Sequence, residues 1–180
     1  MSSVAPEYTP PLPDSGFKRR GNRRAGGLYS PDSRYRYRLW QRWDSTRGNC
    51  CFVLTRPGPQ DEAGTDPVLV RLAGIAAGAG CGGMDVVTLF ARRAPNWSDL
   101  ERSSDPVGPA NDVVLMHAAT SAAMVVCAWG QHGLFMGRGR SVQQMLESAG
   151  IGLFILGETA AGHPEHPSLV SFDRQPVRWR

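Results

Sequence analysis

The sequence predicts an α/β fold, namely a three-layer sandwich with a mainly parallel four-stranded central sheet and an N-terminal antiparallel edge strand. Two observations lead to this prediction. Short apolar runs typical of buried strands alternate along the chain with helical segments, and each run is followed by a polar loop rich in glycine, proline or histidine. Strands joined through helices in this order imply right-handed crossovers and parallel neighbours.

The front of the chain is basic and differs in composition from the rest. Residues 1–48 hold ten basic and four acidic side chains, a net charge of +6, whereas the remainder carries −2. We expect residues 1–33, with several prolines and glycines and the cluster KRRGNRR, to form a disordered basic arm. Residues 34–180 are expected to form a single α/β domain. The arm either binds nucleic-acid phosphates or is simply a solvated tail.

Cysteine spacing and hydropathy restrict the class of protein. The four cysteines have neither zinc-site nor redox C-x-x-C spacing, so no metal and no cofactor is expected. No apolar stretch is long enough to span a bilayer, and no signal-peptide core is present. These features predict a cytoplasmic protein without a membrane partner, and they leave the oligomeric state open.

The first predicted strand has a two-residue period. In RYRYRLWQRWD, Tyr35, Tyr37 and Leu39 alternate with arginines, which is typical of a half-buried strand. We expect it to turn at residues 45–48 and to pair with residues 50–55. Its arginines then lie on the solvent face of an edge strand.

The later elements follow in order. A helix begins with Asp66 as its cap and Pro67 in its first position, and it ends at the glycines of residues 80–83. A short helix contains Trp97 and Leu100. The other expected elements are strands at 84–90, 124–130 and 151–156 and helices at 108–122 and 141–150.

Polar loops follow the predicted strands, with the sequences TRPG, ARRAPN, AWGQHG and GHPEHPS. Ligands of parallel sheets bind at the carboxyl ends of the strands, so we expect these loops to meet at one binding edge. The ligand-binding candidates are Arg56, Pro57, Gly58, Thr88, Phe90, Arg92, Arg93, Trp129, Gly130, His132, His163 and Ser168.

Six motifs, YRYRLWQRWD, DPVLVRLAG, VVTLFARRA, DPVGPANDVVL, VVCAWGQHG and GHPEHPS, resemble the bacterial and phage family known as domain of unknown function 1643. The resemblance runs from about Arg34 to Ser168. The chain departs from that family's usual pattern at Arg56, where an Asn-Pro-Ser loop is common, and at Thr88, where asparagine is common. RPGPQDE and HPEHPS are also distantly similar to the two catalytic loops of the uracil-DNA glycosylase superfamily.

The distant resemblance implies catalytic roles for two loops. Asp61 or Glu62 would orient a water for attack at a sugar carbon. His166, rather than His163, would stabilise negative charge on the departing base. From the residues alone, a non-catalytic interpretation has equal weight. In it the two carboxylates are ordinary solvated acids of a loop, and the histidines are parts of rigid turns beside prolines.

The same resemblance implies contacts to a nucleic acid. Phe90 or Trp129 would stack on an extruded base, and Arg92, Arg93 and the basic arm would hold phosphates. Three functions stay open: a nucleobase-recognising hydrolase of glycosylase type, a non-catalytic nucleic-acid-binding module, and an enzyme or sensor that binds a nucleotide or another small ligand. The expected partner is DNA or a nucleotide.

Overall fold

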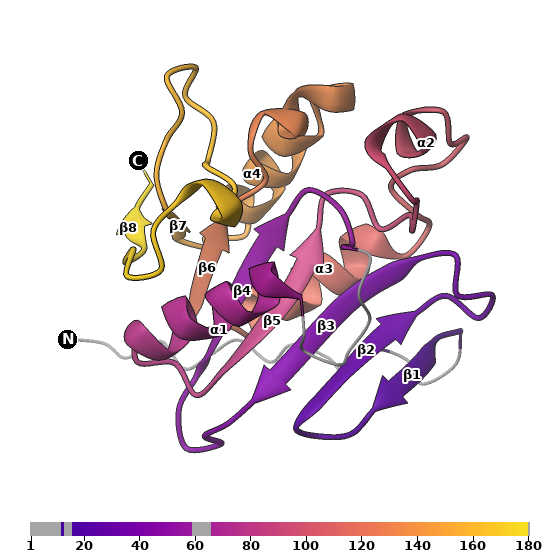
Figure 1. Ribbon diagram of the computed structural model, residues 1–180. Helices are drawn as coiled ribbons and strands as arrows, with labels where there is room; N and C mark the ends of the chain where they lie inside the picture. Colours follow the sequence, from indigo (N-terminus) through magenta and orange to yellow (C-terminus); the bar gives the residue numbers. More distant parts are fainter. Residues whose placement is uncertain (1–11, 13–15, 59–65, 180) are drawn as a thin grey trace.

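Eight strands form one mixed sheet in the computed structural model, which describes residues 12, 16–58 and 66–179 (Figure 1). The strands are β1 (Lys18–Gly21), β2 (Ala25–Tyr29), β3 (Arg36–Arg42), β4 (Asn49–Leu54), β5 (Gly83–Thr88), β6 (Met124–Cys127), β7 (Leu153–Ile155) and β8 (Val177–Arg178). Their order across the sheet is β1-β2-β3-β5-β4-β6-β7-β8. The central strands β5, β4, β6 and β7 are parallel neighbours, and the others pair antiparallel.

Helices connect the parallel strands as predicted. They are α1 (Pro67–Gly78), α2 (Trp97–Glu101), α3 (Asn111–Thr120) and α4 (Arg138–Ser148), with the short 3-10 turns η1 (Gln131–Gly137) and η2 (Pro167–Leu169). The predicted start of α1 is confirmed, because the Asp66 carboxylate accepts the Val68 backbone N–H at 2.7 Å and Pro67 takes the first position. None of the described helices is both long and apolar enough to cross a membrane.

Helices cover both faces of the sheet, which gives the predicted three layers. Figure 1 shows α1 in front of the sheet and α3 and α4 behind it. Side chains of β4 alternate accordingly: Cys50, Phe52 and Leu54 pack with α1, whereas Cys51 and Val53 pack with α3 and α4. Because both faces of β4 are buried, its sequence is a continuous apolar run rather than an alternating one.

Residues of the expected disordered arm form part of the sheet. β1 and β2 make an antiparallel hairpin, with Arg20 opposite Gly27 and Gly21 opposite Gly26. Asn22 closes the turn, because its side-chain oxygen accepts the backbone N–H groups of residues 24 and 25. The prediction of an arm over residues 1–33 is therefore wrong for residues 18–29. The hairpin is stable because the side chains of Leu28 and Tyr29 are fully buried.

The predicted pairing of β3 with residues 50–55 is also wrong. β3 pairs with β2 on one side and β5 on the other, so it is antiparallel as expected but is not an edge strand. An ion-pair cluster accompanies this arrangement. Trp40 is opposite Asp85, whose buried carboxylate binds Arg38 and Arg42 at 2.7 and 2.8 Å. The arginines of β3 thus pair with a buried counter-ion from β5. β4 consists of apolar residues and Asn49, so it contains no such counter-ion.

A β-bulge in β3 divides its arginines between the two faces of the sheet. Leu28 is opposite Arg38 and Tyr29 is opposite Arg36, so Tyr37 is an extra residue. Side chains alternate along a strand, and one extra residue reverses the alternation. Arg36 therefore lies on the α1 face, and Arg38 lies on the α3 face.

Candidate functional site

The loops after the four parallel strands meet at one edge of the sheet, as predicted (Figure 1). Two adjoining cavities, of about 470 and 310 Å³, lie there, and we call them together the strand-end pocket. Both are lined by Arg56, which follows β4, and by His166, which precedes η2. The larger cavity is also lined by Thr55, Trp97, Trp129, Gly130, Gln131, His132, Thr159, Ser168 and Leu169.

Arg56 places a positive charge where the two cavities join. Its side chain is half-buried, and Nη1 donates to the carbonyl oxygens of Pro57 and Ala94 at 3.4 and 3.2 Å. These contacts attach the guanidinium group to the loops after β4 and β5. Because an arginine carries five N–H donors in a planar fork, it suits a carbonyl-rich or anionic ligand.

His166 has its proton position fixed by the backbone. The ring atom Nδ1 accepts the Ser168 backbone N–H at 3.3 Å and lies 2.8 Å from the Ser168 hydroxyl. A backbone N–H can only donate, so Nδ1 is the acceptor and the proton of the neutral ring resides on Nε2. Burial lowers the pKa of His166, the neighbouring His132 lowers it further, and Asp66 opposes the shift. The ring is thus a neutral N–H donor near pH 7.

The loop that carries His166 is tied to the end of β6. The Gly130 backbone N–H donates to the Pro164 carbonyl at 2.8 Å, and the Glu165 N–H donates to the Gly157 carbonyl at 2.8 Å. Gly130 has a φ of +67°, in the left-handed region that favours glycine. A side chain at this position would strain the backbone directly beside His166, whose Cβ is 3.5 Å from where the new Cβ would stand.

Aromatic rings line one side of the larger cavity. Trp97 and His132 have ring centroids 4.1 Å apart, with an angle of 37° between their planes. Phe90 and Phe135 support Trp97 from the core, at centroid distances of 6.0 and 5.6 Å. Trp129 also lines the cavity but is only 3% exposed, and its backbone carbonyl accepts the Thr55 hydroxyl. Trp97 is therefore the more accessible ring.

The smaller cavity contains a carboxylate. Asp66, the cap of α1, lines it together with Arg36, Arg56 and His166. One oxygen of Asp66 accepts the Val68 N–H, and the other lies toward Gly58, where an added Cβ would stand 2.7 Å from it. Glycine at this position therefore leaves room for the acid. The cavity thus brings an acid, two arginines and a histidine together.

Most of the predicted ligand-binding residues are in the pocket. The structure brings together Arg56, Pro57, Gly58, Trp129, Gly130, His132, His166 and Ser168. Asp61 and Glu62, the predicted catalytic acids, lie outside the described residues. His163 is half-buried but lines neither cavity, and its backbone carbonyl accepts the Thr159 N–H at 2.8 Å.

Thr88 and Phe90 belong to the core and not to the pocket surface. The Thr88 hydroxyl is buried and donates to the Phe90 carbonyl at 2.8 Å. Phe90 is 0% exposed and packs against Trp97 and Phe135. The prediction that Phe90 stacks on a ligand is therefore not supported, because the ring has no exposed face in this structure.

Arg92 and Arg93 lie over tyrosines beside the pocket. Arg92 lies over the ring of Tyr35 at 5.6 Å, and Arg93 lies over Tyr29 at 5.5 Å. Arg93 also lines a separate hollow of about 290 Å³ with Gly58. The two arginines therefore flank the strand-end pocket and do not form its wall.

Trp97, Asp66 and Arg36 were missed as site residues by sequence reasoning. Trp97 reads as the apolar residue of a short helix, and Asp66 reads as a helix cap, which it also is. Arg36 belongs to a period-two arginine pattern, and only the bulge turns it toward α1. The available signal was position, since Asp66 and Trp97 both follow strands that end at the predicted edge.

No group of three or more histidine, cysteine, aspartate and glutamate side chains among the described residues is arranged to hold a metal ion. A comparison with curated proteins and with solved structures finds no match. A family model described as "Protein of unknown function (DUF1643)" matches residues 36–168, from the first residue of β3 to the serine that contacts His166. The chain therefore belongs to this family.

Proposed function

We propose that the strand-end pocket binds a nucleobase and that the protein hydrolyses an N-glycosidic bond. The observation that carries the proposal is the neutral His166, whose proton is fixed on Nε2, in a pocket that also contains Arg56 and the Trp97 ring. A neutral imidazole keeps one N–H group, which can donate a hydrogen bond to a base oxygen on which negative charge develops.

The shape and chemistry of the larger cavity suit a planar heterocycle. Its volume of about 470 Å³ is within the range of small-molecule sites. The Trp97 ring offers a stacking surface, and every base has a flat face that can stack on it. Arg56 and His166 offer donors, which complement the carbonyl oxygens of a base edge.

Hydrolysis requires a water and a group that accepts its proton. In the proposed step the water oxygen bonds to the sugar carbon, the bond from that carbon to the base nitrogen breaks, and the base takes the bonding electrons. His166 stabilises the departing base, and a carboxylate accepts the proton of the water. Asp66 lines the smaller cavity and is one candidate for this carboxylate, and Asp61 and Glu62 are the others.

The distant similarity to uracil-DNA glycosylases agrees with this reading. That similarity rests on RPGPQDE and HPEHPS, and the first three residues of the former and His166 of the latter line the pocket. Arg56 occupies the position at which the domain of unknown function 1643 family often has asparagine. We therefore expect this pocket to recognise a different base edge from a pocket that contains the asparagine.

The proposal is tested by incubating the protein with oligonucleotides that carry uracil, hypoxanthine or other altered bases and measuring free base. His166→Asn removes the Nε2 donor, so we expect it to lower release by about 10²-fold or more. His163→Asn is the matched control, because His163 is in the same loop but lines neither cavity. Equal release by wild type and His166→Asn, or no release of any base, would overturn the proposal.

The water-orienting acid is identified in the same assay. Asp66→Asn keeps the helix cap, because asparagine is an equally good cap, but it removes the charge. Asp61→Asn and Glu62→Gln complete the set. We expect one of the three to abolish release, and full release by all three would exclude these acids from the hydrolytic step.

A further inference from the structure

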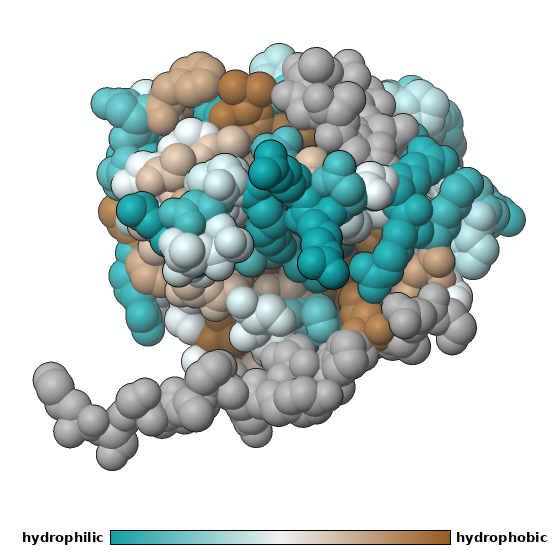
Figure 2. Space-filling view, turned by 90° about the horizontal axis from the view of Figure 1, so that it is seen from below, coloured by the Kyte–Doolittle hydropathy of each residue, from teal (hydrophilic) through white to brown (hydrophobic). Residues whose placement is uncertain are grey.

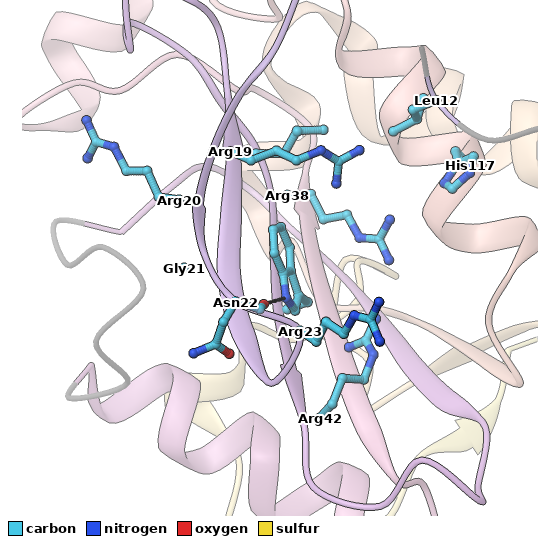
Figure 3. Close-up of a pocket in the computed structure, with 11 residues that line it drawn as sticks. Leu12, Arg19, Arg20, Gly21, Asn22, Arg23, Arg38, Arg42 and His117 are labelled. Carbon is cyan, nitrogen blue, oxygen red and sulfur yellow. Dashed lines mark hydrogen bonds between the residues drawn. The ribbon is translucent and has the colours of Figure 1, made fainter. Parts of the chain in front are cut away.

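A second, strongly basic cavity lies on the opposite face of the sheet from α1. It has a volume of about 790 Å³, and we call it the basic groove. Its lining comes from β1 and the turn after it, from β3, and from α3, which contributes His117. Figure 3 shows Arg19, Arg23, Arg38 and Arg42 extending toward the same side, while Arg20 points away.

The arginines of the basic groove differ in their burial. Arg38 and Arg42 share the carboxylate of Asp85, which is 2% exposed. Arg19 and Arg23 are exposed. Half-buried and exposed arginines thus line the same groove. Figure 2 shows hydrophilic residues over the centre and right of the molecule, on the side that carries β1 and β2 in Figure 1.

The arginines of β3 are held in place before any ligand arrives. Arg42 donates to the carbonyls of Gln41 and Met84, at 2.9 and 2.6 Å, as well as to both oxygens of Asp85. Arg38 donates through Nε to Asp85 at 2.7 Å. Fixed side chains lose little conformational freedom on binding, which favours affinity.

A tryptophan lies between these arginines. Trp40 lines the groove, and its indole N–H donates to the Asn22 carbonyl at 2.9 Å. The ring lies against the backbone of β2, because a Cβ added to Gly26 would stand 2.3 Å from it. Glycine at this position thus leaves room for the indole to pack against β2. The result is a fixed aromatic surface among positive charges.

We propose that the basic groove binds the phosphate backbone of a single-stranded nucleic acid, with a base against Trp40. Charged grooves interleaved with aromatic rings are the usual means of binding single strands without sequence preference. The groove takes its arginines from two separate strands, because Arg19 belongs to β1 and Arg38 and Arg42 belong to β3. β2 lies between β1 and β3 in the sheet, so their backbones are about 10 Å apart, which suits a chain of phosphates better than one phosphate group. This site does not rest on the proposed hydrolytic function.

Binding is tested with the full chain and a fluorescein-labelled oligothymidylate of about twenty nucleotides, by fluorescence anisotropy at several salt concentrations. The variant is Arg19→Gln with Arg23→Gln, because both side chains are exposed and neither holds Asp85. We expect affinity to fall about tenfold and the slope of log K against log salt to decrease by about 1.4, as for two lost phosphate contacts.

The matched control is Arg140→Gln with Arg174→Gln, which removes the same charge from exposed positions outside the groove. We expect this control pair to bind like wild type. An equal loss of affinity in the control pair would show that binding depends only on net charge, and it would overturn the proposal. Equally effective competition by polyglutamate would overturn it too, because the groove would then prefer any polyanion, acidic peptides included.

Discussion

The Nδ1 atom of His166 accepts the Ser168 backbone N–H at 3.3 Å, so one imidazole caps the η2 turn and offers a donor from its other nitrogen. The two roles use different atoms of the ring. They can therefore be separated by substitution, because asparagine resembles the Nδ1 side of histidine and glutamine reaches the position of Nε2.

His166→Asn is expected to keep the cap and lose the donor. Its amide oxygen can accept the Ser168 N–H, so the thermal midpoint should stay close to that of wild type, while base release falls. His166→Gln should show the reverse pattern, with weaker capping and partly retained release. Both are measured by thermal unfolding and by the base-release assay. Parallel losses of stability and release in both variants would mean that the residue is only structural.

The stability of the protein should depend on pH through His166. Its pKa is lowered from 6.5 in the folded chain by burial, so the unfolded chain takes up a proton first as pH falls below about 6.5. The free energy of unfolding should therefore fall from pH 7 to about pH 5, more in wild type than in His166→Asn. Denaturant unfolding at several pH values measures this. An equal fall in both proteins would contradict the assignment.

Trp97 should contribute to ligand affinity through stacking. Trp97→Ala is expected to weaken base binding by about 1–3 kcal/mol, and Trp97→Phe is expected to weaken it less, because a flat ring remains. Trp43→Phe is the control for loss of an indole, since Trp43 is 44% exposed and lines neither pocket cavity. Titration with free bases measures the effect. Unchanged affinity in Trp97→Ala would exclude stacking on this ring.

Asp85 should matter for stability more than any exposed acid. Asp85→Asn leaves Arg38 and Arg42 without their shared counter-ion, and we expect the free energy of unfolding to fall by about 3 kcal/mol. Asp99→Asn breaks a comparatively exposed pair with Arg102 and should cost less than about 1 kcal/mol. Urea unfolding compares the two, and similar costs would contradict the role assigned to Asp85.

The parallel core could be predicted because its information is local. Buried strands such as β4 are apolar runs, and the Asp66-Pro67 pair marks a helix start by its own chemistry. Parallel strands then bring their following loops to one edge. The convergence of Arg56 and His166 follows from that topology, although the presence of the Trp97 ring in the same cavity does not.

The hairpin and the neighbour of β3 could not be predicted because they depend on distant partners. β1 and β2 read as a polar, glycine-rich tail until Leu28 and Tyr29 are buried by the rest of the sheet. The neighbour of β3 is linked to Asp85, the one acid within the β5 strand. That acid inside an apolar run was the available signal for an arginine partner.

The central claim is that His166 is a neutral donor that meets a base in the strand-end pocket. Long-range ¹H–¹⁵N spectra of the histidine rings test it most directly, with His166→Asn used for assignment. We predict a neutral ring protonated at Nε2 at pH 7, and a shift of the Nε2 resonance on addition of uracil or hypoxanthine while the His163 resonances stay in place. A charged ring, a proton on Nδ1, or no shift with either base would contradict the account.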